Sequence, residues 1–123
     1  MTVGDLDVVA GAALLRRAAD HLDGLRATVP DGRWSARGLL ASRPEIVAED
    51  PAGTTEHVAE ARSRTARWIL TMSPDLAVPL VAWLRTTAEE LERSGAATES
   101  TAAAVDLATV VLERGGTAAG PPS

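Results

Sequence analysis

The chain has 123 residues, the length of one domain, and is long enough to bury a core without disulfides or metals. It contains no cysteine, which excludes thiol catalysis and cysteine-based zinc sites and fits a reducing compartment. Its 17 acidic residues outnumber 12 basic residues, all arginine, and give a net charge of −5. We therefore expect no binding to nucleic acid or to anionic lipid.

The N-terminal sequence MTVGDLDVV carries aspartates where a secretory signal would carry basic residues. The longest apolar runs, AVPLVAWL and ATVVL, are far shorter than the roughly 20 residues that a membrane span requires. The sequence therefore predicts a cytoplasmic protein without a membrane partner.

The first segment, residues 5–29, has the periodicity of an amphipathic helix. Its apolar stripe consists of Val8, Ala12, Leu15, Ala19, Leu22 and Leu25. Asp5 or Asp7 is expected to cap this helix, and the turn sequence Pro30-Asp31-Gly32 is expected to end it.

Residues 33–53 lose the helical period and contain the β-branched pair Ile46 and Val47. This pattern predicts two short strands paired as a hairpin. The sequence Asp50-Pro51-Ala52-Gly53 is typical of a turn and closes the segment.

A second helix is expected from Thr54 or Thr55 onward, because apolar residues again recur on one face. That face carries Val58, Ala61, Thr65, Trp68, Ile69 and Met72. Ser73 and Pro74 then predict a new helix start, as N-cap and first helical residue. The core stripe of this third helix is Leu76, Leu80, Leu84, Ala88 and Leu91. Pro79 is expected to bend it, and Gly95 to cap its C-terminus.

A final helix is expected from about Ser100 to Arg114 and should stop at Gly115-Gly116. Its apolar residues are Ala104, Val105, Ala108, Val111 and Leu112. The predicted fold class is α+β and mostly helical, with four helices and a short β-hairpin between helix 1 and helix 2. We expect residues 1–116 to form a single small domain and residues 117–123 a flexible tail.

The stretch TARWILTMSPDLAVPLVAWL, residues 65–84, contains two of the three tryptophans. We interpret it as core, with Trp68, Ile69 and Met72 of one helix packed against leucines of the next. A binding groove is the alternative interpretation, because Trp83 lies beside the main apolar stripe and is a candidate for exposure.

Catalytic chemistry is not evident in the sequence. His21 and His57 are the two histidines, and Glu60 would share a helix face with His57. A metal site needs three or four ligands and no second cluster accompanies this pair, so we interpret it as solvated helix surface. No serine nucleophile elbow or phosphate-binding loop is present. We expect neither catalytic residues nor a cofactor.

Helical carboxylates suggest one enzyme, an all-α Mg²⁺-dependent nucleotide hydrolase. The candidate ligands are Glu89, Glu90, Glu92, Asp106 and Glu113. The second helix lacks the paired acidic spacing that such a site requires, so this is the weaker alternative.

Three arginines, Arg62, Arg64 and Arg67, cluster on the second helix. They either pair with the chain's own carboxylates, which would contribute little to stability, or bind an acidic partner. Together with Trp83 they are the candidate partner-binding residues.

The sequences ATVPDGRW at 27–34 and TARWILTMSPDLAVPLVAWL at 65–84 resemble short proteins of actinobacterial phages, prophages and Streptomyces-type genomes. Those proteins combine an ATPGPW turn with a DAxxIAxxxPxxxLALAxWL segment, and Ead-like early proteins of lambdoid phages are similar. Pro30 and Trp34 match the turn, Pro74 the helix start, and Trp83-Leu84 the closing WL. The resemblance implies a mobile-element origin and no reaction.

Taken together, the sequence favours a non-enzymatic interaction protein, an accessory factor that binds a protein partner. The alternative is a homo-oligomeric scaffold in which the last helix or Trp83 closes a homodimer interface.

Overall fold

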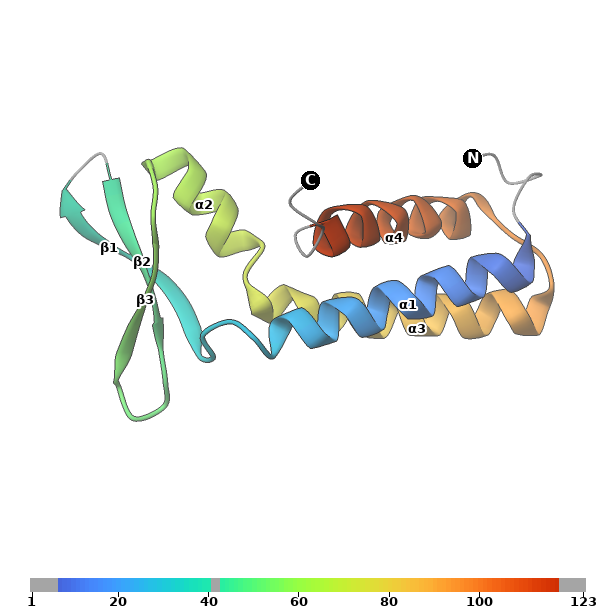
Figure 1. Ribbon diagram of the computed structural model, residues 1–123, viewed down its shortest axis with the longest axis horizontal. Helices are drawn as coiled ribbons and strands as arrows, with labels where there is room; N and C mark the ends of the chain where they lie inside the picture. The colour runs from blue at the N-terminus through green and yellow to red at the C-terminus, as the bar shows by residue number, and fades with distance from the viewer. Residues whose placement is uncertain (1–6, 41–42, 118–123) are drawn as a thin grey trace. The chain divides into compact units, whose positions relative to one another are not determined.

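A computed structural model describes residues 7–40 and 43–117 (Figure 1). Its elements are α1 (Val8–Arg26), β1 (Arg33–Leu40), β2 (Arg43–Glu49), β3 (Thr55–Glu60), α2 (Ser63–Thr71), α3 (Pro74–Ser94) and α4 (Glu99–Thr117). The predicted fold class is confirmed: the described chain is α+β and mostly helical, with four helices and an antiparallel sheet between α1 and α2. The expected cap Asp5 and residues 118–123 of the expected tail lie outside the described residues.

The chain divides into two compact units. The helical unit combines residues 1–24 with residues 79–123, and the sheet unit is Leu25–Val78. One boundary falls near the end of α1 and the other at Pro79, through which α3 continues without interruption. Each unit packs around its own buried residues. The prediction of a single domain over residues 1–116 stays a prediction.

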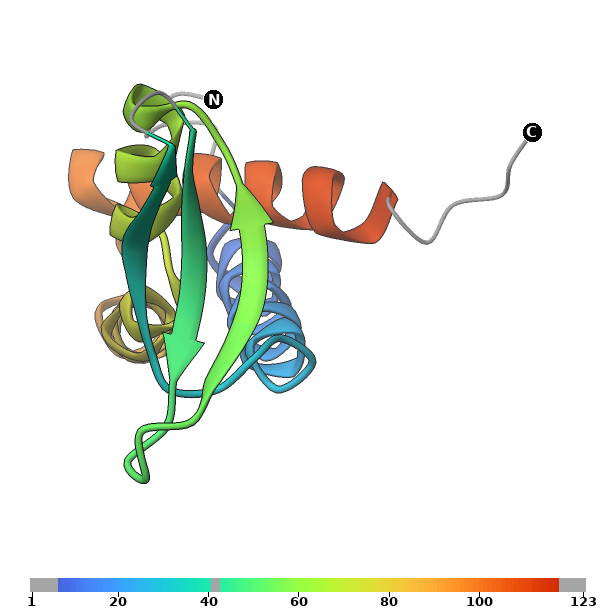
Figure 2. The same cartoon turned by 90° about the vertical axis from the view of Figure 1, so that its left-hand side faces the viewer.

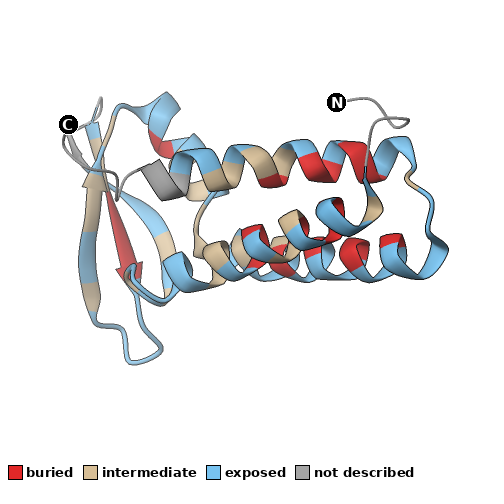
Figure 3. Cartoon of the chain, turned by 45° about the vertical axis from the view of Figure 1, so that its right-hand side comes forward, coloured by how far each residue is buried: buried red, intermediate tan, exposed pale blue. Residues whose placement is uncertain are grey.

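Helices α1, α3 and α4 build the helical unit and turn their buried residues toward one another (Figure 3). The core consists of Ala12, Leu15, Ala18, Ala19, Val81, Leu84, Ala88, Leu91, Ala104, Val105 and Ala108. Alanine side chains let the helix backbones approach closely, and the leucines fill the remaining space. The apolar stripes predicted for the first and last helices are therefore confirmed, except that Leu25 is exposed.

Two helix starts follow the local chemistry expected from the sequence. Asp7 caps α1, because its Oδ1 accepts the N–H groups of Val9 at 2.9 Å and Ala10 at 3.3 Å. Pro74 is the first residue of α3, where an N–H would have no intrahelical acceptor, so its absence costs no hydrogen bond.

The two helix ends differ in how well they were predicted. Gly95 ends α3 with a φ of +67° and donates its N–H to the carbonyl of Leu91, as expected for a C-terminal glycine. The predicted stop at Gly115-Gly116 is wrong, because α4 continues to Thr117. Glycine weakens a helix by about 1 kcal/mol relative to alanine but keeps the backbone donor that the helix needs.

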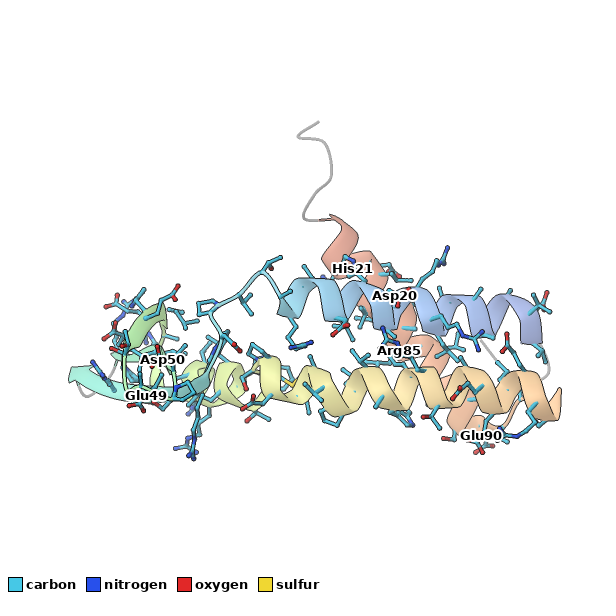
Figure 4. All side chains as sticks on the ribbon, turned by 90° about the horizontal axis from the view of Figure 1, so that it is seen from below. Asp20, His21, Glu49, Asp50, Arg85 and Glu90 are labelled. Carbon is cyan, nitrogen blue, oxygen red and sulfur yellow. The ribbon has the colours of Figure 1, made fainter. Side chains whose placement is uncertain are left out.

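Ion pairs join α1 to α3 in the helical unit. Arg16 donates two hydrogen bonds to the carboxylate of Glu92, at 2.7 and 2.6 Å, in a bidentate arrangement. The hydrogen bonds that Arg16 donates lower the pKa of Glu92 below its ordinary value and raise the pKa of Arg16 itself. Between the two helices, the Nη2 atom of Arg85 on α3 lies 3.0 Å from the Oδ1 atom of Asp20 on α1 (Figure 4). These pairs favour one antiparallel register of α1 and α3.

The sheet unit holds three antiparallel strands in the order β1-β2-β3, with α2 packed on β1 and β2 (Figure 2). Successive residues of the central strand, Ile46, Val47 and Ala48, are all buried although they point to alternate faces. Both faces of β2 are therefore shielded. Arg33 of β1 is the cross-strand partner of Glu49 of β2, which places opposite charges side by side.

Residues 55–60 correct the sequence interpretation, because they form strand β3 and not the start of the second helix. The helical spacing of Val58, Ala61 and Thr65 is coincidental. Pairing with β2 covers an edge that a two-stranded hairpin would leave open, and this long-range contact outweighs the local pattern. Helix α2 begins only at Ser63.

The turn before β1 is fixed by two interactions. The indole Nε1 of Trp34 donates a hydrogen bond to the carbonyl of Pro30 at 3.0 Å. Gly32 has a φ of +100°, and a side chain there would overlap the carbonyl group of Glu49. The Pro30 to Trp34 spacing therefore closes a tight turn against the end of β2.

The core interpretation of residues 65–84 is only partly right. Val81 and Leu84 are buried, and Ala66 is buried against the sheet. Trp68, however, is 66% exposed, and Met72 and Leu76 are also exposed, so the prediction that these side chains are core is wrong. The smaller Ala66 takes the central inward position on α2.

Candidate functional site

Two arginines of the predicted cluster, Arg64 and Arg67, are exposed residues of α2, and Arg62 is its N-cap residue. Ala66 is buried and Ile69 and Leu70 are partly buried, so these residues define the inner side of the helix. Arg64, Trp68 and Met72 follow one another at intervals of four on the opposite side. This spacing aligns a cation, an indole and a thioether in one exposed row.

We call the surface formed by Arg62, Arg64, Arg67, Trp68 and Met72 the α2 face. Its two large apolar side chains are 66% and 49% exposed, for Trp68 and Met72 respectively. Exposed apolar residues are common on proteins, but a tryptophan and a methionine four residues apart, in the row that begins with Arg64, form a patch typical of binding surfaces.

The arginines of the α2 face are not neutralised within the described part of the chain. Arg62, Arg64 and Arg67 are exposed, and none of them lies within 4 Å of a described carboxylate. Of the two interpretations of the cluster, internal pairing thus finds no support among the described residues, and the arginines are available to an acidic partner.

The N-terminus of α2 is poorly suited to carry these arginines. Arg62 is the N-cap residue and makes no side-chain capping hydrogen bond, and the first turn holds no acidic residue. Cations at the positive end of a helix dipole are unfavourable, and an N-cap without a side-chain acceptor leaves backbone donors unsatisfied. The stability of α2 therefore does not account for the arginine cluster.

Trp83, the fourth predicted binding residue, lies in the helical unit and is 41% exposed. It lines a groove of about 570 Å³ formed by α3, the following loop and the start of α4. The same groove contains Thr87, Glu90 and Arg93. We call it the Trp83 groove. Glu90 lies on the side of α3 away from α1 (Figure 4).

The candidate residues therefore belong to two different units of the chain. Arg62, Arg64 and Arg67 lie in the sheet unit, whereas Trp83 lies in the helical unit. The sequence interpretation missed Trp68 as a surface residue. A signal was present, because Trp68 shares its helix face with Arg64, while Ala66, Ile69 and Leu70 form an apolar face without arginine.

The histidine candidates do not form the arrangement expected from the sequence. His57 lies on strand β3, so the helical His57 and Glu60 pair is wrong; its Nδ1 is instead 2.6 Å from Glu45 Oε2 on the neighbouring strand. His21 lies on α1, and its Nε2 is buried without a hydrogen-bond partner. Among the described residues, no three histidine or carboxylate side chains gather as a metal site would require.

The carboxylates weighed for Mg²⁺ binding do not form a metal-type cluster among the described residues. Glu92 is paired with Arg16, and Glu89 lies with Arg16, Asp20 and Arg85 beside the ion pairs that join α1 to α3. Glu90 lines the Trp83 groove.

Within residues 7–40 and 43–117, no helix is both long and apolar enough to cross a membrane. Comparisons of the chain with protein-family models, curated proteins and solved structures found no match.

Proposed function

We propose that the protein is a non-enzymatic interaction protein that binds an acidic partner protein through the α2 face. The observation that carries this proposal is the α2 face itself, where Arg62, Arg64 and Arg67 have no described carboxylate within 4 Å and Trp68 is 66% exposed.

The composition of the α2 face matches that of energetically important interface centres. Tryptophan and arginine are enriched among residues whose truncation weakens binding most, and methionine is enriched at interfaces in general. A partner that presents carboxylates around an apolar side chain would neutralise the arginines and cover the indole. It would also supply the negative charge that the N-terminus of α2 lacks.

Affinity capture from an actinobacterial lysate tests the proposal. The tagged wild-type protein is compared with an Arg62→Ala/Arg64→Ala/Arg67→Ala variant and with Trp68→Ala, and retained proteins are quantified by mass spectrometry. A matched control, Arg17→Ala/Arg37→Ala/Arg114→Ala, removes three exposed arginines that also lack a described ion pair, so the change in net charge is the same.

We expect one partner at near-stoichiometric amounts with the wild type and the control, and a loss of that partner with both α2-face variants. Equal capture of the partner by the arginine variant and the control would contradict the proposal. In that case the position of the arginines on the protein would not matter for binding.

The mobile-element part of the proposal rests on the sequence resemblance at residues 27–34 and 65–84. The hydrogen bond from Trp34 to the Pro30 carbonyl gives a structural reason for the spacing within the first of these motifs. A cytoplasmic location is also part of the proposal, and the lack of cysteine in the chain fits a reducing compartment.

A further inference from the structure

The Trp83 groove has an unusually polar lining for a pocket of its size. Its volume of about 570 Å³ lies within the range of roughly 300–1,000 Å³ that is common for small-molecule sites, but most such sites are lined by apolar side chains. Here hydroxyl groups dominate, on Thr86, Thr87, Ser94, Thr98, Ser100 and Thr101. The whole lining belongs to the helical unit. This composition favours a small hydrophilic ligand.

Two neighbouring hydroxyl groups of the groove have one hydrogen to spare. Thr101 is only 8% exposed, and its Oγ1 lies 3.1 Å from Oγ1 of Thr98, which also accepts the N–H of Thr101. The two hydroxyl groups carry two hydrogens, and their mutual hydrogen bond uses one of them. The other hydrogen has no acceptor among the described residues, so an oxygen atom of a ligand in the groove can accept it.

Four exposed polar side chains of the groove are also unengaged. Thr86, Glu90, Arg93 and Ser100 make no hydrogen bond or ion pair with any described residue. The carboxylate of Glu90 only accepts hydrogen bonds, the guanidinium of Arg93 only donates them, and each hydroxyl group does both. Glu90 and Arg93 are opposite in charge and one turn apart on α3. The pair therefore favours a ligand that has no net charge and that both donates and accepts hydrogen bonds.

Trp83 adds a flat apolar surface to these polar groups. Its side chain is 41% exposed, and its indole N–H has no acceptor among the described residues. The C–H groups on one face of a sugar ring pack against an aromatic ring, while the sugar hydroxyls project from the edge of the ring. Each of these hydroxyls both donates and accepts. A sugar therefore matches the indole and the mixed donors and acceptors beside it.

We infer that the Trp83 groove binds a small uncharged carbohydrate, a mono- or disaccharide. The indole of Trp83 packs against one face of a sugar ring, Glu90 accepts hydrogen bonds from sugar hydroxyls, and Arg93 donates to them. This site is independent of the α2 face, because the two belong to different units of the chain.

Heteronuclear NMR titrations of the purified full chain test the inference. The probes are glucose, N-acetylglucosamine, maltose, cellobiose and lactose, with glycine as a zwitterionic probe and inorganic phosphate as an anionic one. We expect at least one saccharide to shift the indole N–H signal of Trp83 and the amide signals of Thr86 and Ser100 in a saturable way. The signals of Trp34 in the sheet unit should not move. We expect a Kd in the millimolar range, because sugar hydroxyls exchange hydrogen bonds with water for those with the protein.

Variants of the groove test which side chains are responsible. Trp83→Ala should weaken saccharide binding by about tenfold or more, and Trp83→Phe should retain most of it, because phenylalanine keeps an aromatic face. Glu90→Ala should also weaken binding. The matched control Asp106→Ala removes an exposed carboxylate of α4 outside the groove lining and should leave the affinity unchanged. The same spectra show that each variant is folded.

The inference would be overturned if no saccharide shifted the groove signals up to its solubility limit. It would also be overturned if glycine or phosphate bound in preference to the saccharides, or if Trp83→Ala bound a saccharide as well as the wild type does. Trp68→Ala, which should lose the captured protein partner, should keep the saccharide affinity. Carbohydrate binding and partner capture are therefore tested separately, and either can fail without the other.

Discussion

Replacing Gly32 by alanine should destabilise the sheet unit more than the same change at Gly53. Both glycines have positive φ, +100° and +88°, which costs an alanine about 1–2 kcal/mol. At Gly32 the new Cβ would also overlap the carbonyl oxygen of Glu49 and lie 2.8 Å from its carbon. At Gly53 its nearest neighbour is the Glu49 side chain, at 4.0 Å.

The overlap at Gly32 involves backbone in a paired strand, so relieving it requires a shift that costs about 1–3 kcal/mol more. Alanine returns about 0.4–1 kcal/mol in both variants by reducing the entropy of the unfolded chain. We therefore expect losses of about 2–4 kcal/mol for Gly32→Ala and about 1 kcal/mol for Gly53→Ala.

Urea unfolding followed by the indole N–H signals in NMR spectra measures this difference. Trp34, which is hydrogen-bonded to Pro30 in the same turn, reports on the sheet unit, and Trp83 reports on the helical unit. A loss of stability at Gly32 no larger than that at Gly53 would refute the account of this turn.

Three further predictions follow from the helices. Trp68→Ala should change the free energy of unfolding by less than about 1 kcal/mol, because Trp68 is exposed, whereas replacing the buried Leu84 by alanine should cost about 2–5 kcal/mol. Equal losses of stability in chemical denaturation would contradict the exposure of Trp68. Arg62→Ser should stabilise the protein by about 1 kcal/mol through N-capping of α2 and should weaken partner capture. Stronger partner capture by the stabilised variant would contradict a role of Arg62 in binding. Glu92 has a lowered pKa because Arg16 hydrogen-bonds to it, so its contribution is present above the ordinary carboxyl value of 4.5 and is lost as pH falls through the folded value. Thermal unfolding of Glu92→Gln should therefore depend less on pH in this acidic range than that of the wild type.

The helical unit was largely predictable because its determinants are local. Leucine and alanine at helical spacing mark the buried sides of α1, α3 and α4, and Asp7, Pro74 and Gly95 mark helix ends by their own backbone chemistry. The pairing of Arg16 with Glu92 was not predictable, since it joins residues 76 positions apart in the sequence.

The sheet unit was harder to predict because its structure depends on distant contacts. Residues 55–60 have a spacing compatible with a helix, and only pairing with β2 makes them a strand. The resulting shift in the start of α2 changes which residues can face inward. Once α2 begins at Ser63, the small Ala66 packs against the sheet and Trp68 faces outward.

The candidate site was predicted in part for the same reason. Arg62, Arg64 and Arg67 stand out by charge alone, and the structure leaves them without described ion pairs. Trp68 was assigned to the core because large aromatic residues are usually buried, and its exposed fraction of 66% reverses that assignment. The exposed tryptophan converts an arginine cluster into a surface with both charge and apolar area.

Photo-crosslinking from the α2 face tests the central claim most directly. A benzophenone amino acid is substituted at Trp68 and, as a control, at Val9, an apolar residue of α1 that is 78% exposed. Irradiation of the protein in lysate should give a discrete adduct from position 68, containing the partner or a second copy, and no adduct from position 9. Equal adduct patterns from the two positions, or none from position 68, would contradict the assignment of the α2 face as the binding surface.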